Sequence, residues 1–443
     1  MTRRALVIGG GMSGMRCALE LAALDVPVTL VERSSRLGGH AINIESTWRG
    51  TPLSEVAKAM AREVASHPKI ELILNGEVVS HTGKAGSFTS KIVIDGERSV
   101  VVTHGVTIVA IGAEEYVPKE YLYSKSSRVL THLEFDSLLA KDRELEELVG
   151  RSGVVAFIQC VGSREPERPY CSRVCCTHTI KRALLLKERY PGLDIYVFYR
   201  QLRTFGLKES LLLDARQKGI KFVHFDREKR PIVREVVTME GEAPGVETSL
   251  KVTYWDSLSK REDSIYPGLL ILATAIVPDQ ENVRTISRVL GIPLDEDLFL
   301  KEAHLKLRPV ETIQKGVFLV GLAQYPKEID ETISQCLAVV SRAYASILSQ
   351  KRLILENPVA KIVLQKCDGC GVCVDPCPYR AIKTVEYVFK GEVKKIVEIE
   401  EANCTGCGIC VATCPKEAVE IAGFEPDTIM TQIEALLEDG QKV

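Results

Sequence analysis

The sequence lacks both a long apolar run and a dominant charge. None of its apolar stretches reaches the roughly 20 residues that a helix needs to cross a bilayer. The most apolar of them, such as residues 269–277, have the length of a strand. The 57 lysines and arginines nearly balance the 59 aspartates and glutamates, so the formal net charge is −2. We therefore expect no membrane span and no nucleic-acid partner, since a basic surface is missing.

The sequence also lacks a secretory signal and the common hydrolytic motifs. Arg3 and Arg4 give a positive start, but the apolar run after them ends at Gly9, too early for the apolar core of a signal peptide. We therefore expect a cytoplasmic protein. No Ser-His-Asp set, catalytic carboxylate pair or zinc-hydrolase motif is present, so no catalytic residues are predicted.

What is present in excess is cysteine. The chain has 443 residues and 14 cysteines, twelve of which fall into three groups of four. In a reducing compartment, such groups bind metal or carry out redox chemistry rather than form structural disulfides. Cys17 and Cys336 stand apart in helical apolar patterns, and we interpret both as buried small hydrophobic residues.

The first 32 residues predict a strand, a glycine-rich turn, a helix and a second strand. The turn has the pattern G-x-G-x-x-G, in which Gly9 allows a tight turn, Gly11 lets a pyrophosphate approach and Gly14 lets helix and strand pack closely. Phosphates then bind the free N–H groups at the helix start. Glu32 closes the second strand, where it can bind ribose hydroxyls. The residues assigned to the dinucleotide are Gly9, Gly11, Met12, Ser13, Gly14 and Glu32.

Three further segments resemble the two-dinucleotide-binding flavoproteins, to which thioredoxin reductase belongs. They are Glu32-Arg33 followed by Gly38-Gly39, the strand and glycine at 107–112, and the strand and glycine at 316–321. The resemblance implies FAD rather than NAD at the first site. Leu322 replaces the aspartate that normally contacts the ribityl chain. A helix starting near Glu331 would point its positive end at the flavin and favour an anionic reduced flavin.

A second α/β unit follows but has no glycine-rich loop of its own. The strand at 153–158 leads into Gln159-Cys160 and then into Cys171, Cys175 and Cys176. Without a phosphate cradle, direct use of NAD(P)H is not expected. Four thiolates suffice for one [4Fe–4S] cluster. A redox-active dithiol, a zinc site and inert thiols remain open as alternatives.

These residues also resemble the flavin-binding, A-type subunits of heterodisulfide reductases. The resemblance rests on residues 157–164 (FIQCVGSR), 170–176 (YCSRVCC) and 321–335, and it extends over residues 1–424. It implies that Cys160, Cys171, Cys175 and Cys176 ligate a cluster beside the FAD. Together, the two resemblances assign these further residues to the cofactor: Arg33, Gly38, Gly39, Ala110, Gly112, Gly321, Gln324, Glu331 and Thr332.

The C-terminal part carries the run C-x2-C-x2-C-x3-C-P twice, which is typical of a two-cluster ferredoxin. Three cysteines of each run bind one cluster, and the fourth reaches the other cluster. One [4Fe–4S] cluster is therefore predicted on Cys367, Cys370, Cys373 and Cys414, and the second on Cys404, Cys407, Cys410 and Cys377. Two structural zinc sites are the alternative.

The predicted fold is an α/β two-dinucleotide-binding flavoprotein plus a C-terminal ferredoxin-like α+β domain. A Rossmann-like FAD domain is split between residues 1–148 and 268–350, around an inserted α/β domain at 149–267. The ferredoxin domain covers 358–424, and residues 425–443 are expected to form a helix packed on it.

The predicted function is electron transfer between FAD, which carries two electrons, and three [4Fe–4S] clusters, which carry one each. The resemblance implies an oxidoreductase component with heterodisulfide-reductase-like B and C subunits, hydrogenase, formate dehydrogenase or other iron–sulfur subunits as partners. We expect a dimer of a hetero-oligomeric complex, and electron bifurcation is an activity of some relatives. The alternatives are a self-contained NAD(P)H-dependent flavin disulfide reductase and a passive ferredoxin-like scaffold with an empty flavin fold.

Overall fold

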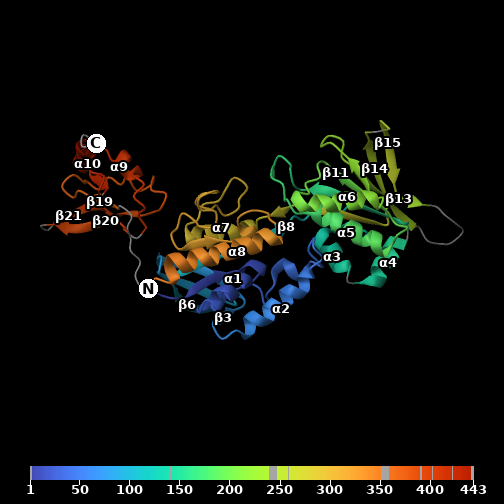
Figure 1. Cartoon of the computed structure of the whole chain (residues 1–443), viewed down its shortest axis with the longest axis horizontal. Helices are drawn as coiled ribbons and strands as arrows, with labels where there is room; N and C mark the ends of the chain where they lie inside the picture. Colours follow the sequence, from blue (N-terminus) through green and yellow to red (C-terminus); the bar gives the residue numbers. More distant parts are fainter. Residues whose placement is uncertain are drawn as a thin grey trace.

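The computed structural model describes residues 2–139, 141–150, 152–238, 247–257, 259–350, 359–389, 392–401, 403–421 and 423–440. Figure 1 shows three parts along its longest axis. The N-terminal dinucleotide-binding domain lies in the middle, the second α/β domain at one end and the cysteine-rich C-terminal domain at the other. Residues 351–358, which precede the cysteine-rich domain, lie outside the described residues.

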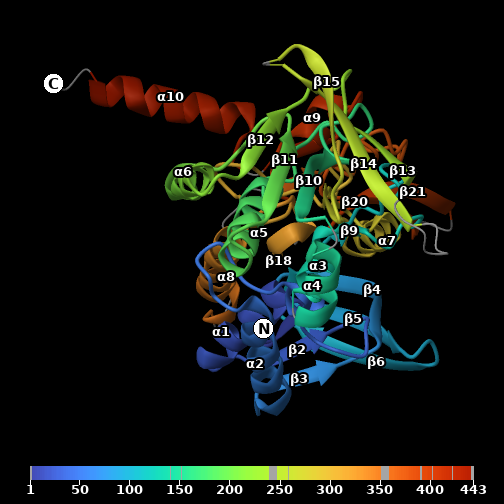
Figure 2. The same ribbon diagram turned by 90° about the vertical axis from the view of Figure 1, so that its right-hand side faces the viewer.

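The N-terminal domain is built on a five-stranded parallel sheet in the order β18-β7-β1-β2-β3. Its strands are β1 (Ala5–Ile8), β2 (Val28–Val31), β3 (Ile70–Ile73), β7 (Val106–Val109) and β18 (Val317–Leu319). The central strands are buried on both faces, as expected for a parallel sheet covered on both sides. Figure 2 shows this sheet with α1 and α8 beside it.

Different elements cover the two faces of this sheet. Helices α1 (Met12–Ala23) and α8 (Ile329–Ala343) pack on one face, where Cys17 and Cys336 are buried as predicted. Helix α7 (Gln280–Leu290) and a three-stranded antiparallel sheet pack on the other. The remaining elements are β4 (Gly76–Lys84), β5 (Ser87–Ile94), β6 (Arg98–His104), α2 (Leu53–Ser66), the 3-10 turns Gly39–Asn43 and Gly321–Ala323, and the π-helical turn Tyr344–Leu348.

The second domain has its own five-stranded parallel core in the order β12-β11-β10-β16-β9. Helix α5 (Cys175–Arg189) packs on one face of this sheet, and a separate antiparallel sheet β13-β14-β15 packs on the other. The elements are β9 (Val129–Thr131), α3 (His132–Leu138), α4 (Asp142–Gly150), β10 (Val154–Val161), β11 (Asp194–Tyr199), the 3-10 turn Gly206–Lys208, α6 (Glu209–Gln217), β12 (Lys221–His224), β13 (Ile232–Thr238), β14 (Glu247–Asp256), β15 (Arg261–Ile265) and β16 (Leu269–Thr274).

The predicted domain boundaries cut through this second sheet. Strand β16 pairs with β10, and β9 pairs with β16, so both belong to the inserted domain although they lie outside residues 149–267. The boundary predictions were wrong here, because an apolar run shows that a strand is buried but not which sheet it joins. Two short strands, β8 (Glu114–Glu115) and β17 (Ile276–Val277), pair with each other where the chain passes between the domains.

The cysteine-rich domain consists of two antiparallel strand pairs and a short helix. Its elements are β19 (Ala360–Ile362), β20 (Ile382–Phe389), β21 (Glu392–Ile399), α9 (Ile409–Thr413) and β22 (Val419–Ile421), and α10 (Pro426–Gly440) follows. The predicted helix at the C-terminal end is present. The expectation that it packs on the ferredoxin domain is wrong for its described side chains, since Ile429, Met430, Ile433, Leu436 and Leu437 are all exposed. Figure 2 shows α10 projecting from the body of the molecule.

Candidate functional site

The glycine-rich turn at residues 9–14 leaves no room for side chains at two of its glycines. A Cβ on Gly14 would lie 1.8 Å from the carbonyl oxygen of Gly9, and a Cβ on Gly9 would lie 2.3 Å from that of Ala110. A Cβ on Gly11 would instead meet no atom within 4 Å. The open space beside Gly11, at the start of α1, agrees with the pyrophosphate position that the sequence predicts.

Glu32 lies directly after β2 and faces this turn. Its Oε2 accepts a hydrogen bond from the backbone N–H of Gly10 at 2.6 Å, and its Oε1 accepts two from Ser34 at 2.8 and 2.7 Å. Gly38 donates its N–H to the Gly10 carbonyl at 2.9 Å and, like Gly39, has a positive φ. The structure thus brings Glu32 and the predicted Gly38-Gly39 segment to the edge of the glycine turn.

Three other predicted residues take different positions around this edge. Ala110 follows β7 and donates its N–H to Ile8 at the end of β1, and Gly112 has a positive φ with no atom within 4 Å of an added Cβ. The side chain of Arg33 points to acidic partners. Its guanidinium donates to Asp279 at 2.5 Å and to Glu114 at 3.0 Å. These ion pairs link Arg33 to the start of α7 and to β8, one of the two short strands where the chain passes between the domains.

The second predicted flavin element packs directly against the first. A Cβ on Gly321 would lie 2.2 Å from the hydroxyl of Ser13 in the first turn of α1, and Thr332 of α8 lies beside the same glycine. Gly321 donates its N–H to Oε1 of Gln335 at 2.8 Å. The second flavin element therefore joins the first turn of α1 to α8, and residues 13, 321 and 332 form one wall of the predicted flavin site. Met12 is partly buried and packs against the core of the domain.

The side chains of Gln324 and Glu331 are already bound within the protein. The Gln324 amide donates to Glu302 at 3.0 Å and to the carbonyl of Pro309 at 2.9 Å, while its oxygen accepts from Lys327 at 3.0 Å. Glu331 accepts from Arg173 at 2.7 Å and from the N–H of Glu328 at 3.1 Å. Both remain predictions as cofactor residues, although these contacts occupy their polar atoms.

Lys327 is a buried cation beside this wall. It is 4% exposed, donates to Gln335 at 2.8 Å and lies 3.8 Å from the ring centre of Tyr325. Burial lowers the pKa of Lys327 to about 7, although the nearby Glu331 opposes the shift. The Lys327 ammonium therefore gains or loses its charge near neutral pH, next to the predicted flavin position.

The four cysteines of the second domain come together at one end of α5. Cys160, Cys175 and Cys176 are buried and Cys171 is half-buried, and the thiol of Cys175 interacts electrostatically with the other three. Burial and the neighbouring Cys176 raise the pKa of Cys160. A hydrogen bond from Cys175 lowers the pKa of Cys176 to about 7, with Arg203 and Arg164 nearby. These grouped thiols repel one another as thiolates, and they are a suitable donor set for the cationic core of an iron–sulfur cluster.

Strand β10 bends where it delivers the first of these cysteines. Its register with β16 shifts between Ile158 and Val161, and Cys160 has a φ of 62°, in the left-handed region. Bulges and strained residues of this kind re-aim side chains at functional sites. The bend directs Cys160 toward the cysteines of the following loop and helix. The left-handed residue is Cys160 itself and not a glycine, so the sequence did not indicate the bend.

Arg173 ties the cysteine loop to the predicted flavin element. It lies between Cys171 and Cys175, and its guanidinium donates to the carboxylate of Glu331 at 2.7 Å and to the carbonyl of Pro326 at 3.3 Å. The N–H of Arg173 also donates to Sγ of Cys171 at 3.3 Å. The cysteine group therefore lies against the start of α8.

A buried ionic network that the sequence did not predict fixes α5. Arg182 donates to Asp136 of α3 and to Glu45 of the N-terminal domain. His178 contacts the same carboxylate at 3.0 Å and stacks on His132 at 4.6 Å between ring centres. No local motif marks a network whose members lie this far apart in the sequence.

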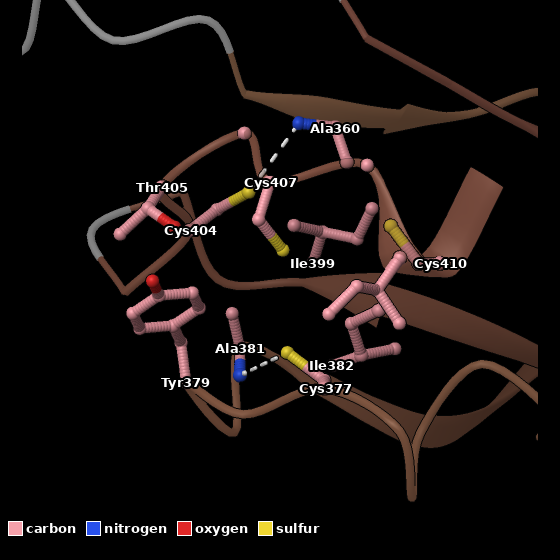
Figure 3. A pocket seen from close by; sticks show the side chains of 13 residues that line it. Ala360, Cys377, Tyr379, Ala381, Ile382, Ile399, Cys404, Thr405, Cys407 and Cys410 are labelled. Carbon is pink, nitrogen blue, oxygen red and sulfur yellow. Dashed lines mark hydrogen bonds between the residues drawn. The ribbon is translucent and has the colours of Figure 1, made fainter. Parts of the chain in front are cut away.

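The two C-terminal cysteine runs line two cavities, and each cavity contains one cysteine from the other run. The larger cavity, about 340 Å³, is lined by Cys404, Cys407, Cys410 and the crossing Cys377 (Figure 3). The second, about 260 Å³, is lined by Cys367, Cys370, Cys373 and the crossing Cys414. This grouping is the one that the spacing predicted for two [4Fe–4S] clusters.

Backbone N–H groups reach the sulfur atoms in both cavities. Ala360, Ala381 and Ala418 donate to Sγ of Cys404, Cys377 and Cys414 at 3.4, 3.4 and 3.3 Å, the first two of which are drawn in Figure 3. Such bonds stabilise the negative charge of a reduced cluster. Burial and the neighbouring thiols raise the pKa of Cys410 to about 11.

Two other kinds of feature are absent from the described residues. No three histidine, cysteine, aspartate or glutamate side chains in the described ranges converge on a single metal-ion position. A [4Fe–4S] cluster requires no such convergence, because each thiolate binds a different iron. In the same ranges, no helix combines the length and apolarity that a membrane span requires.

Comparisons with known proteins agree with this geometry. A 4Fe-4S dicluster domain model matches residues 366–418, and an NAD(P)-binding Rossmann-like domain model matches residues 7–68. The chain is 31% identical over 475 residues to an A-type iron-sulfur subunit of the CoB--CoM heterodisulfide reductase of Methanopyrus kandleri, covering 87% of this chain and 70% of the relative. It is 30% identical over 525 residues to the A-type subunit of the H(2):CoB-CoM heterodisulfide,ferredoxin reductase of Methanothermobacter marburgensis, covering 98% of this chain and 76% of the relative.

Solved structures support the fold alone. The thioredoxin reductase of T. acidophilum aligns with a TM-score of 0.50 at 14% identity, over 77% of this chain and 98% of that chain. The thioredoxin reductase of Lactococcus lactis aligns with the same score at 17% identity and the same coverage. The predicted two-dinucleotide-binding fold with an added iron–sulfur domain is therefore confirmed.

Proposed function

The chain belongs to the family of A-type heterodisulfide reductase subunits, and on this premise we propose that it transfers electrons between one FAD and three [4Fe–4S] clusters within a multi-subunit complex. As a member of this family it is an oxidoreductase, the iron–sulfur flavoprotein component of such an enzyme. When bound, FAD supplies two-electron chemistry and each cluster exchanges one electron.

The proposed FAD site comprises the glycine turn and the second predicted flavin element, which packs against the turn at Ser13. Gly11 would leave space for the pyrophosphate, Glu32 at the edge of the turn would bind the ribose, and residues 13, 321 and 332 would line the site beside it. The buried Lys327 adds positive charge that would favour an anionic reduced flavin. These residues bind and orient the cofactor, and none of them is proposed to react with a substrate.

The third cluster is proposed on Cys160, Cys171, Cys175 and Cys176. The observation that supports it best is the docking of Arg173 on Glu331, which brings the cysteine loop against the predicted flavin element. This arrangement gives a two-electron carrier an adjacent one-electron carrier. The clusters of the two C-terminal cavities would then pass electrons to or from partner subunits.

The partners are proposed to be B-like and C-like subunits of a heterodisulfide reductase, or hydrogenase, formate dehydrogenase and other iron–sulfur subunits. We place the complex in the cytoplasm, as a dimer of hetero-oligomers. Electron bifurcation is proposed as one mode of action. In that mode, one two-electron donor gives a single electron to each of two acceptors of different potential.

The proposal is tested by purifying the full chain without oxygen and measuring its flavin, iron and electron transfer. We expect one FAD and about twelve iron atoms per chain, as three four-iron clusters require, and bleaching of both chromophores by a low-potential reductant. NAD(P)H alone should reduce neither. Rapid flavin reduction by NAD(P)H would instead support the self-contained reductase, and a chain without flavin would support the passive scaffold.

A further inference from the structure

Three side chains beside the second-domain cysteines carry buried polar atoms that have no hydrogen-bond partner. Among the described residues, both amide atoms of Gln159, one terminal nitrogen of Arg164 and the hydroxyl of Thr177 have no partner and almost no contact with solvent. Gln159 is 1% exposed and Thr177 4%. Leaving a buried polar atom unpaired is unfavourable, because the atom loses its hydrogen bonds to water, so such groups normally indicate an unseen partner.

Gln159 lies where it can reach the space between the cysteines. Val155 and Phe157 of β10 face α5, and because side chains alternate along a strand, Gln159 continues this face toward the first turn of α5. That turn contains Cys175 and Cys176. By this alternation, the amide faces from the strand that carries Cys160 toward the helix turn that carries Cys175 and Cys176.

The surroundings of this space favour a negatively charged group. Helix α5 begins there, and no side chain caps its first N–H groups, so its positive end is open. Arg164 lies close enough to interact electrostatically with both Cys160 and Cys176. A [4Fe–4S] cluster on four thiolates carries net negative charge, and its sulfur atoms accept hydrogen bonds.

The ferredoxin domain provides an internal comparison. The hydroxyl of Thr405 is likewise buried and unpartnered, and it lines the cavity of Cys404, Cys407 and Cys410. Unpaired buried polar atoms therefore recur beside two separate cysteine groups of this chain. At either site, a sulfur atom of a bound cluster would be a hydrogen-bond acceptor for these groups.

We propose that the Gln159 amide donates an N–H to a sulfur atom of the cluster on Cys160, Cys171, Cys175 and Cys176, and so sets its reduction potential. The inference rests on the third cluster of the proposed function and adds a positioning residue to it. Thr177 and Arg164 supply further donors to the same group. Each hydrogen bond stabilises the more negative, reduced cluster and raises its potential.

The test compares Gln159→Met with wild type in the full chain, purified without oxygen. Methionine keeps the length and removes both polar atoms. Redox titration followed by electron paramagnetic resonance gives the potential of each cluster, and the signal that disappears in Cys176→Ala identifies the cluster in question. The two C-terminal clusters of the same sample serve as unshifted references. Thr177→Val, which keeps the side-chain shape, is the second variant.

We expect Gln159→Met to retain its iron and flavin and to shift only the Cys176-dependent signal to a more negative potential. Thr177→Val should shift it in the same direction. An unchanged potential in both variants, with full iron content, would overturn the role of Gln159 and leave the third cluster intact. A wild-type chain with iron only in its C-terminal domain would overturn the third cluster itself, and this inference with it.

Discussion

The guanidinium of Arg182 binds the carboxylate of Asp136 through two parallel hydrogen bonds, from Nε to Oδ1 and from Nη2 to Oδ2, each 2.6 Å long. The two side chains are 1% and 0% exposed. The pair joins α5 to α3, and Arg182 also reaches Glu45 in the N-terminal domain. Since α5 begins with Cys175, the pair fixes the cysteines relative to the predicted flavin site.

Asp136→Ala should destabilise the chain strongly. It would leave the buried Arg182 charge without its main partner, and breaking a buried pair in this way costs about 3–5 kcal/mol of unfolding free energy. Denaturant titration under anaerobic conditions, followed through the unfolding transition of the second domain, measures this loss of unfolding free energy. Replacing both residues, as in Asp136→Leu with Arg182→Met, should recover part of the stability, since no uncompensated charge remains.

The control for this prediction is Asp142→Ala. Asp142 pairs with Arg189 at 3.3 Å, but its side chain is 89% exposed. Exposed pairs contribute about 0–1 kcal/mol. Equal losses for Asp136→Ala and Asp142→Ala would show that burial of the Arg182 pair has no special effect.

Gly11→Ala and Gly14→Ala should separate flavin binding from folding. An added Cβ on Gly11 meets nothing within 4 Å, and Gly11 has an ordinary φ of −73°, so the variant should fold with less bound FAD. An added Cβ on Gly14 lies 1.8 Å from a backbone oxygen, so this variant should lose stability as well. Flavin-to-protein ratio and thermal unfolding of the flavin-free chain measure the two effects. A Gly11→Ala chain with full flavin content would contradict the assigned pyrophosphate position.

Paired cysteine variants test the crossed arrangement of the two C-terminal cavities. Cys414→Ser combined with Cys370→Ser alters one cavity and should remove about four irons, the content of one cluster. Cys414→Ser combined with Cys407→Ser alters both cavities and should remove about eight. Iron analysis distinguishes the two. If each run held its own cluster instead, Cys414→Ser with Cys407→Ser would alter a single cluster, and this double variant would lose less iron than Cys414→Ser with Cys370→Ser.

Lys327→Met should change how stability depends on pH. The pKa of Lys327 is about 7 in the folded chain against an ordinary 10.5, because burial disfavours the charged form. Between these values the unfolded chain binds the extra proton, so the contribution of Lys327 to unfolding free energy rises with pH. Wild type should therefore gain stability relative to Lys327→Met from pH 7 to pH 9. If the difference in unfolding free energy between wild type and Lys327→Met were the same at pH 7 and at pH 9, this titration of Lys327 would be ruled out.

The glycine turn and the crossed grouping of the C-terminal cysteines were predictable because their signals are local. Gly9 and Gly14 leave no room for a Cβ, Gly11 leaves open space at the start of α1, and the spacing of Cys367 to Cys377 already implies which cysteine crosses. Chemistry that depends on a few adjacent residues leaves a readable pattern in the sequence.

The remaining features depend on contacts between distant segments. Asp136 and Arg182 meet across 46 residues, and no periodicity marks either as half of a pair. Strands β9 and β16 were assigned to the wrong domain because pairing partners are not visible in apolar runs. The bend at Cys160 arises without a glycine, so only the three-dimensional structure shows that Gln159 is left unpaired.

The crossed cavities also constrain when the C-terminal domain can acquire its iron during synthesis. The cavity lined by the first run includes Cys414, and the cavity lined by the second needs Cys410, so neither ligand set exists until nearly the whole domain has left the ribosome. Cofactor insertion must therefore follow translation of this region, and a nascent chain stalled between the runs would expose the unliganded thiols of the first run to oxidants.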